Sequence, residues 1–144
     1  MKLTFQDYIS IKIHKTDLNL TSYIKTKLEP YNLAPEQNLV MMLLWEEDGL
    51  TQNQVAEKLN KDKTNIARMA SNLEKKGFIK RCKCPDDGRS QKLYLTPCGK
   101  KLSEKVIPLA DKFNEKVCKD FSKEELLELE RLLSKINRNV QELV

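Results

Sequence analysis

Residues 50–99 read LTQNQVAEKLNKDKTNIARMASNLEKKGFIKRCKCPDDGRSQKLYLTPCG. Residues 51–54 (TQNQ) match a capping box, in which the Thr oxygen accepts a backbone N–H and the Gln reaches back, so a helix is predicted that ends near Leu59. Asp62 is the predicted N-cap of a second helix that ends at Gly77. Two helices of this length across a short turn predict a helix-turn-helix.

The second of these helices has an apolar side and a polar side. The apolar side carries Ile66, Met69, Ala70 and Leu73 at helical spacing. The polar side includes Lys63, Thr64, Asn65 and Arg68. In a helix-turn-helix the second helix enters the major groove with its N-terminal residues on base edges. We therefore predict that these four side chains read DNA, although a plain solvated helix face would show a similar pattern.

A β-hairpin is predicted directly after this helix. Residues 78–83 are predicted to form its first strand, residues 85–90 a loop and residues 92–95 the second strand. A hairpin in this position is a wing, and Arg89 would lie at its tip beside Asp86 and Asp87.

Positive charge concentrates in the same part of the chain. The whole sequence carries a net charge of +5, whereas residues 60–101 contain twelve Lys or Arg against four Asp or Glu, a net charge of +8 that leaves −3 for the remainder. Clustered cations of this kind favour a polyanionic partner, because neutralising a phosphate backbone needs neighbouring positive charges.

Long helices are predicted on both sides of this stretch. One is expected over residues 5–29, another from Pro35 to Gly49, and a third from Thr96-Pro97. Ser122 to Glu125 forms a second capping box at the start of the last helix. In that helix apolar residues recur at heptad spacing and predict a dimerisation seam of Leu129, Leu133, Ile136 and Val140.

The fold class predicted from these patterns is mainly α with a small β-wing. Residues 35–96 would form a winged helix-turn-helix, and residues 1–34 and 97–144 a helical dimerisation region. No apolar run approaches the roughly 20 residues that span a bilayer, and no signal peptide begins the chain, so we expect a cytoplasmic protein that does not bind a membrane. No glycine loop for phosphates and no nucleophile motif points to an enzyme.

The four cysteines at positions 82, 84, 98 and 118 are expected to be free thiols. Cys82 and Cys84 lie two apart on a predicted strand, hence on one face, among cationic residues that favour the reactive thiolate. A redox switch at these two residues is one alternative, and incidental thiols are the other. Two cysteines supply only two zinc ligands and His14 is the single histidine, so neither a metal nor another cofactor is predicted.

The order of elements resembles that of the MarR family of bacterial transcription regulators. The most specific match is Asp87-Gly88-Arg89, then Leu95-Thr96 and Gly99, which is similar to the family's D-x-R … L-T-x-x-G signature. The segments LTQNQVAEKLN and DKTNIARMASNLEKKGFIKR resemble its helix-turn-helix.

This resemblance implies a homodimer whose terminal helices interlock and which presents two winged helices to a pseudo-palindromic operator in double-stranded DNA. It implies that Arg89, oriented by Asp87, enters the minor groove, whose negative potential attracts a guanidinium, while Gly88 gives the tip conformational latitude. It also implies a repressor of nearby genes, released by a small aromatic or anionic effector bound between the dimerisation helices and the winged domain.

No tight motif marks the effector site. Met41, Met42, Trp45 and His14 are candidates for positions near it, and core packing is the favoured interpretation of the first three. Some relatives sense oxidants through a cysteine in the first helix, but here none precedes Cys82. A winged-helix module that mediates protein association without reading DNA remains an alternative.

Overall fold

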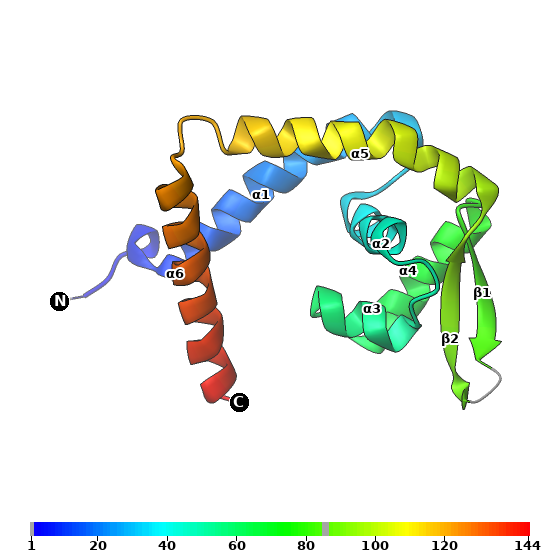
Figure 1. Ribbon diagram of the computed structural model, residues 1–144. Coiled ribbons are helices and arrows are strands. Elements are labelled where there is room, and N and C mark those ends of the chain that lie inside the picture. Colours follow the sequence, from blue (N-terminus) through cyan, green and yellow to red (C-terminus); the bar gives the residue numbers. More distant parts are fainter. Residues whose placement is uncertain (1, 85–86) are drawn as a thin grey trace. The chain divides into compact units, whose positions relative to one another are not determined.

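The computed structural model describes residues 2–84 and 87–144, with the backbone but not the side chains of residues 84 and 87–90. In chain order its elements are η1 (Phe5–Asp7), α1 (Ile9–Leu28), η2 (Glu29–Tyr31), α2 (Pro35–Glu46), α3 (Gln52–Leu59), α4 (Lys63–Lys75), β1 (Ile79–Cys84), β2 (Asp87–Leu95), α5 (Pro97–Val117) and α6 (Lys123–Glu142) (Figure 1). They divide into two compact units, Met1–Leu109 and Ala110–Val144, with the boundary inside α5.

The first unit is organised around one apolar core. Each of α2, α3 and α4 contributes its inner side, and the C-terminal end of α1, the wing and the start of α5 close around them. The most deeply buried large side chains are Leu28, Val40, Met41, Leu44, Val55, Ile66, Leu73, Ile79, Leu93 and Val106. Because Leu28 of α1 and Val106 of α5 lie in the same core, both flanking helices fold together with the winged helix where they adjoin it.

Both helices of the helix-turn-helix begin where they were predicted to begin. Thr51 Oγ1 accepts the Gln54 N–H at 3.1 Å, and Gln54 Oε1 accepts the Thr51 N–H at 2.8 Å, which completes the capping box of α3. Asn60 ends that helix in the left-handed region with φ 56°. Asp62 Oδ1 then accepts the Asn65 N–H at 2.7 Å and caps α4. Since a cap satisfies amide groups that the first helical turn leaves without partners, these residues fix where each helix starts.

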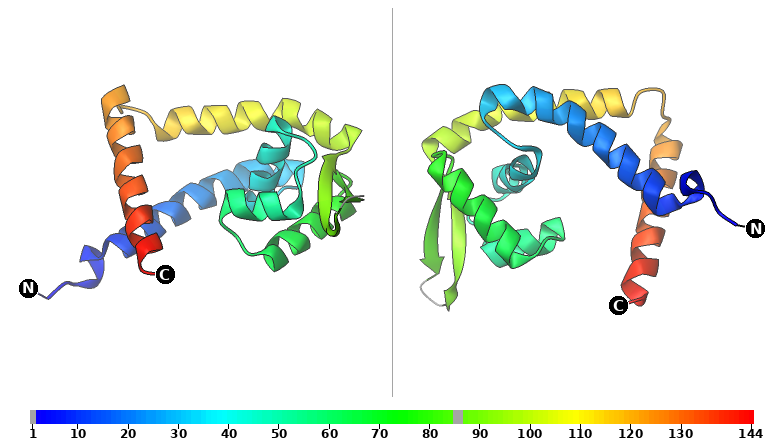
Figure 2. Two further views of the ribbon diagram at one scale, coloured as in Figure 1. Left: turned by 60° about the horizontal axis from the view of Figure 1, so that its bottom comes forward. Right: turned by 180° about the vertical axis from the view of Figure 1, so that it is seen from behind.

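The wing is an antiparallel pair of strands that is longer than predicted. Strand β1 lies against α4, and β2 lies against α2 and α3 (Figures 1 and 2). A short third segment joins this sheet, because the Leu93 N–H donates to Leu50 O at 2.8 Å and the Gly49 N–H donates to Leu93 O at 3.0 Å.

The predicted loop over residues 85–90 is wrong for residues 87–90, since β2 begins at Asp87, where it pairs with Cys84. Residues 85 and 86 lie outside the described part of the chain. Asp, Gly and Ser disfavour strands locally, but cross-strand pairing outweighs such preferences. The pairing register shifts between Lys83 and Cys84.

Other element boundaries also differ from the prediction. Helix α2 ends at Glu46 and not at Gly49, and α4 ends at Lys75 and not at Gly77. The expected helix over residues 5–29 is interrupted at Tyr8, whose ψ of 122° is extended. The cause is local: the Asp7 carboxylate accepts the Thr4 N–H at 2.9 Å and so closes a separate turn, and this backbone hydrogen bond lowers the pKa of Asp7. Strand β1 begins at Ile79 and not at Phe78, because the Phe78 N–H still donates to Leu73 O at the end of α4.

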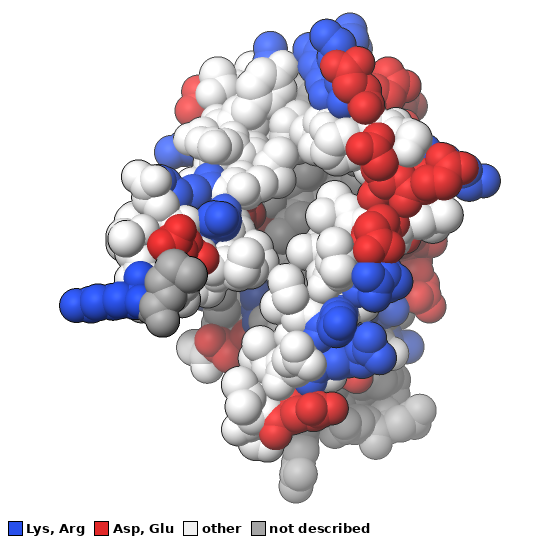
Figure 3. Space-filling model, turned by 90° about the vertical axis from the view of Figure 1, so that its left-hand side faces the viewer, with Lys and Arg blue, Asp and Glu red and all other residues white. Residues whose placement is uncertain are grey.

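The second unit leaves an apolar face of α6 uncovered. Ser122 and Glu125 form the predicted capping box. Leu129, Leu133 and Val140 are 44%, 42% and 54% exposed. Glu124 and Glu125 lie in the first turn of α6, where negative charge suits the positive end of the helix dipole. Figure 3 shows acidic and basic side chains in separate groups on one face of the molecule.

Candidate nucleic-acid interface

Helix α4 presents a polar surface because its other side is anchored in the core. Ile66, Met69, Ala70 and Leu73 are buried, as the helical period predicts. On the opposite side Lys63, Thr64 and Arg68 are exposed and Asn65 is half-buried. The structure therefore brings all four residues predicted to read DNA onto the first two turns of one accessible helix face.

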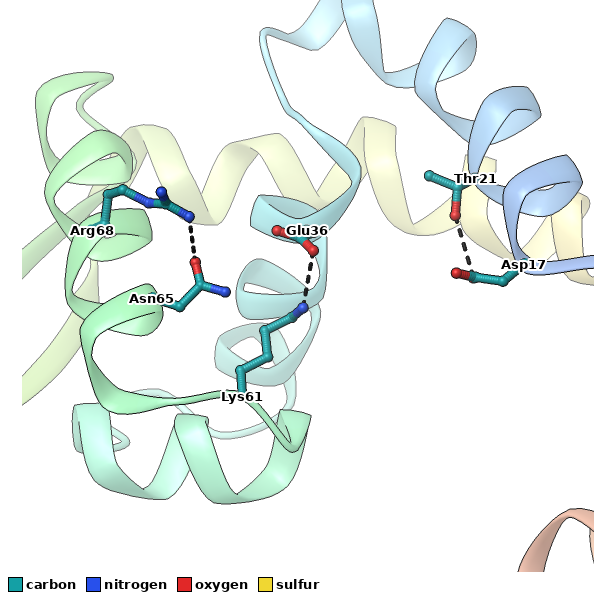
Figure 4. Close-up of polar contacts among 6 residues, drawn as sticks. All are labelled: Asp17, Thr21, Glu36, Lys61, Asn65 and Arg68. Carbon is teal, nitrogen blue, oxygen red and sulfur yellow. Dashed lines mark hydrogen bonds and ion pairs between the residues drawn. The ribbon is translucent and has the colours of Figure 1, made fainter. Parts of the chain in front are cut away.

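Three of these residues share a shallow depression with the N-cap, Asp62. The Asn65 N–H donates to Asp62 Oδ1, while Asn65 Oδ1 accepts from Arg68 Nη2 at 2.6 Å (Figure 4). Asn65 is thus held through both its backbone and its side chain, and the guanidinium of Arg68 has a defined position on the helix surface.

The turn before α4 is tied to a neighbouring helix. Lys61 Nζ lies 3.0 Å from Glu36 Oε1 at the start of α2 (Figure 4). This ion pair joins the turn of the helix-turn-helix to α2. The start of α4 is therefore restrained both by its N-cap, Asp62, and by this contact with α2.

The far end of α4 is restrained by Lys76. Its Nζ donates to the Asn32 carbonyl oxygen and to Gln37 Oε1, both at 2.7 Å. Burial lowers the pKa of Lys76, because a charged amine loses hydration in that position. The periodicity of the sequence gave no signal for this contact, since its partners are 44 and 39 residues away.

The wing is joined to α4 through Glu74 and Arg81. The Glu74 carboxylate accepts both the backbone N–H and the guanidinium of Arg81. The Arg81 backbone hydrogen bond is the largest cause of the lowered pKa of Glu74. Neither residue was predicted as a site residue. One lies at the end of a helix and the other on a strand, so no repeating spacing in the sequence relates the two positions.

For the predicted wing residues the structure describes the backbone but not the side chains. Asp87, Gly88 and Arg89 lie in the backbone of β2, but their side chains are outside the described part of the chain, so their contact with DNA stays a prediction.

The predicted thiol pair stays untested too. Cys82 is half-buried and pairs with Lys92 across the wing, whereas the side chain of Cys84 is not described. The register shift before Cys84 interrupts the alternation that would place both thiols on one face. Among the described residues no cluster of three or more His, Cys, Asp or Glu side chains could hold a metal ion.

The effector candidates occupy different environments. Met41 is fully buried and Trp45, whose Nε1–H donates to Gly99 O at 2.9 Å, packs against the same core. Core packing, the favoured interpretation, is therefore confirmed for these two residues. Met42 is half-buried, and His14 is exposed on α1. Within the described residues, no helix combines the length and apolar character required to cross a bilayer.

Comparison with known proteins shows which family this geometry resembles. The model of the MarR family matches residues 33–91, which span α2 to the wing. The winged helix-turn-helix of this chain is therefore similar to that of the MarR family. Its relatives include the organic hydroperoxide resistance transcriptional regulator of Bacillus subtilis, 29% identical over 76% of this chain and 73% of that protein. MgrA of Staphylococcus aureus is 26% identical over 91% of this chain and 88% of its own length.

Solved structures extend the likeness over nearly the whole chain. MepR of S. aureus, solved as a complex with DNA, is 26% identical, with a TM-score of 0.85 over 96% of this chain and 99% of that one. A MarR protein from Peptoclostridium difficile has a TM-score of 0.87 at 21% identity, which shows the fold alone. The predicted winged helix-turn-helix fold is thus confirmed, as is the predicted likeness to the MarR family, whose members are transcription regulators and not enzymes.

Proposed function

We propose that this protein is a cytoplasmic homodimer that binds a pseudo-palindromic operator and represses nearby genes until a small aromatic or anionic effector releases it. The observation that carries the proposal is the polar face of α4, where Lys63, Thr64, Asn65 and Arg68 are accessible together. A protein with the same fold, MepR, has been solved in complex with DNA, which supports DNA binding here.

In this proposal α4 is the recognition helix and enters the major groove, where its side chains meet the edges of base pairs. The wing follows it, and Arg89 enters the adjacent minor groove with Asp87 and Gly88 at the tip. The Glu74–Arg81 contact supports this arrangement, because it joins the wing to the recognition helix within one folded unit.

Dimerisation is supported by the uncovered face of α6. The apolar residues of the predicted seam are exposed or half-buried in the single chain. Full burial of an exposed aliphatic side chain contributes about 1.5–3 kcal/mol, and these partly exposed side chains would each contribute a part of that. A second copy of the chain would cover this face, and its two-fold symmetry would match an operator with two half-sites.

The test is DNA binding by the full-length protein to duplex from upstream of its own gene. Fluorescence anisotropy should show an affinity that falls steeply as salt rises, because cations that contact phosphates displace counterions. Footprinting should then reveal two half-sites about 10 base pairs apart. Absent or salt-independent binding would instead favour the module that associates with proteins.

A matched pair of variants distinguishes the loss of a DNA contact on α4 from the loss of one positive charge anywhere on the protein. Lys63 and Lys123 each follow an N-cap as the first residue of a helix, and both are exposed. The Lys63→Ala variant should bind the operator more weakly, whereas Lys123→Ala, which loses the same charge, should bind as the parent does. Equal affinities for the two variants would remove the start of α4 from the interface.

A further inference from the structure

We propose that Arg68 reads a guanine in each half-site and that Asn65 positions Arg68 and reads no base itself. The inference rests on the proposed function and deepens it, because it names the base that the recognition helix prefers. It follows from the hydrogen bonds of three residues, Asp62, Asn65 and Arg68.

Asn65 is engaged on both of its sides. Its backbone N–H donates to the N-cap carboxylate of Asp62 at 2.7 Å. Its side-chain oxygen accepts from Arg68 Nη2 at 2.6 Å, on the following turn of the same helix. The oxygen therefore lies along the helix toward a cation (Figure 4).

In this position the Asn65 side chain is poorly placed to recognise adenine, the base that an asparagine usually reads in the major groove. An asparagine that reads adenine accepts from N6 through its oxygen and donates to N7 through its amide nitrogen. In Asn65 the oxygen already accepts from a guanidinium, and a hydrogen bond with a charged partner is roughly twice as strong as a neutral one. An adenine would have to compete with that bond or share the oxygen.

Arg68 retains the capacity that guanine recognition needs. A guanidinium has five N–H donors, and the bond to Asn65 uses one of them. Guanine takes two parallel hydrogen bonds from an arginine, through O6 and N7. Arg81 and Arg131 are each paired with a glutamate, whereas in the described part of the chain no carboxylate forms an ion pair with Arg68. The Arg68 guanidinium is therefore held in place by Asn65 and still has donors free to bind a guanine.

The experiment selects sequences bound by the full-length protein from a random duplex library and reads the preference at each position by sequencing. The parent protein should prefer guanine at one position of each half-site. The Arg68→Ala variant should lose that preference by a factor between about 5 and about 150, the range for one bidentate base contact. The Asn65→Ala variant should weaken the preference at the same position and at no other.

Two further variants sharpen the comparison. Asn72→Ala removes the same side chain from an exposed position two turns later on α4, and it should leave the guanine preference unchanged. In the Arg68→Ala background, Asn65→Ala should add no further loss at that position, because a positioning residue acts only through the residue that it positions. Circular dichroism checks that each variant keeps its helices.

Three results would overturn the inference. If Asn65→Ala abolished an adenine preference at a different position, Asn65 would itself be the reader. If Arg68→Ala weakened all sequences equally and reduced the salt dependence by about two counterions, one for each subunit of the dimer, Arg68 would contact a phosphate. Either result leaves the proposed function standing. If the parent protein enriched no sequence at all, the proposed function would fail and this inference with it.

Discussion

Glu74, near the end of α4, binds Arg81 of β1 through both the backbone and the side chain. Oε2 accepts the Arg81 N–H at 3.0 Å, and Oε1 accepts from Nε at 3.3 Å and from Nη2 at 3.2 Å. One carboxylate thus joins the recognition helix to the first strand of the wing. The contact therefore links the two parts of the proposed DNA-binding surface.

Replacing Glu74 with Gln should destabilise the fold and weaken operator binding. The amide keeps one acceptor but loses the charge, so we expect about 0.5–1 kcal/mol less free energy of unfolding, the scale of a partly exposed ion pair. Urea denaturation measures it. Glu128→Gln is the matched control, since Glu128 pairs with Arg131 on the surface of α6, and its loss should be smaller. An equal loss in both variants would show that Glu74 has no special role.

The same contact should depend on pH in a defined direction. The pKa of Glu74 in the folded chain is lowered below its ordinary value of 4.5, first by the Arg81 backbone N–H. A carboxylate of this kind stabilises the fold at pH values above its unfolded pKa, and the contribution disappears as pH falls through the folded pKa. The difference in stability between the parent and Glu74→Gln should be complete at pH 7 and shrink as the pH falls below 4.5. Denaturation from pH 7 to pH 3 tests this, and a constant difference would contradict it.

Removing the side chain of Arg89 should weaken operator binding by roughly 1–3 kcal/mol, because a guanidinium in a narrow minor groove makes a contact of that size. Anisotropy titration at physiological salt measures the change. Arg131→Ala serves as the control, since it removes the same side chain from α6. If Arg89→Ala and Arg131→Ala bound with equal affinity, Arg89 would not belong to the interface.

An acidic residue in the α6 seam should break the dimer. Leu133→Asp or Ile136→Asp would bury a charge in an apolar interface, which is unfavourable without a partner. Sedimentation should show monomers or unfolded chains. Ser134→Asp adds a carboxylate at an exposed position of the same helix that lies away from the seam at helical spacing, and it should remain dimeric. A stable monomer of Leu133→Asp that still binds the operator would refute the dimer model.

Interactions within three or four residues made much of the fold predictable. The caps at Thr51, Asp62 and Ser122 are local hydrogen bonds, so the starts of α3, α4 and α6 follow from the sequence pattern alone. The apolar period of α4 likewise predicted which side is buried. The placement of Cys82 and Cys84 on one face stays a prediction, because the side chain of Cys84 lies outside the described part of the chain.

The sequence by itself determined the winged helix-turn-helix and the polar face of α4, because caps and periodicity act over single turns. Only the tertiary structure decided what holds that face in place. Lys76 reaches Asn32 and Gln37 in segments far away in the chain, and Glu74 reaches a strand. The start of β2 at Asp87 was decided in the same way, by pairing with another strand. Such contacts depend on how distant segments pack, which no local pattern of residues encodes.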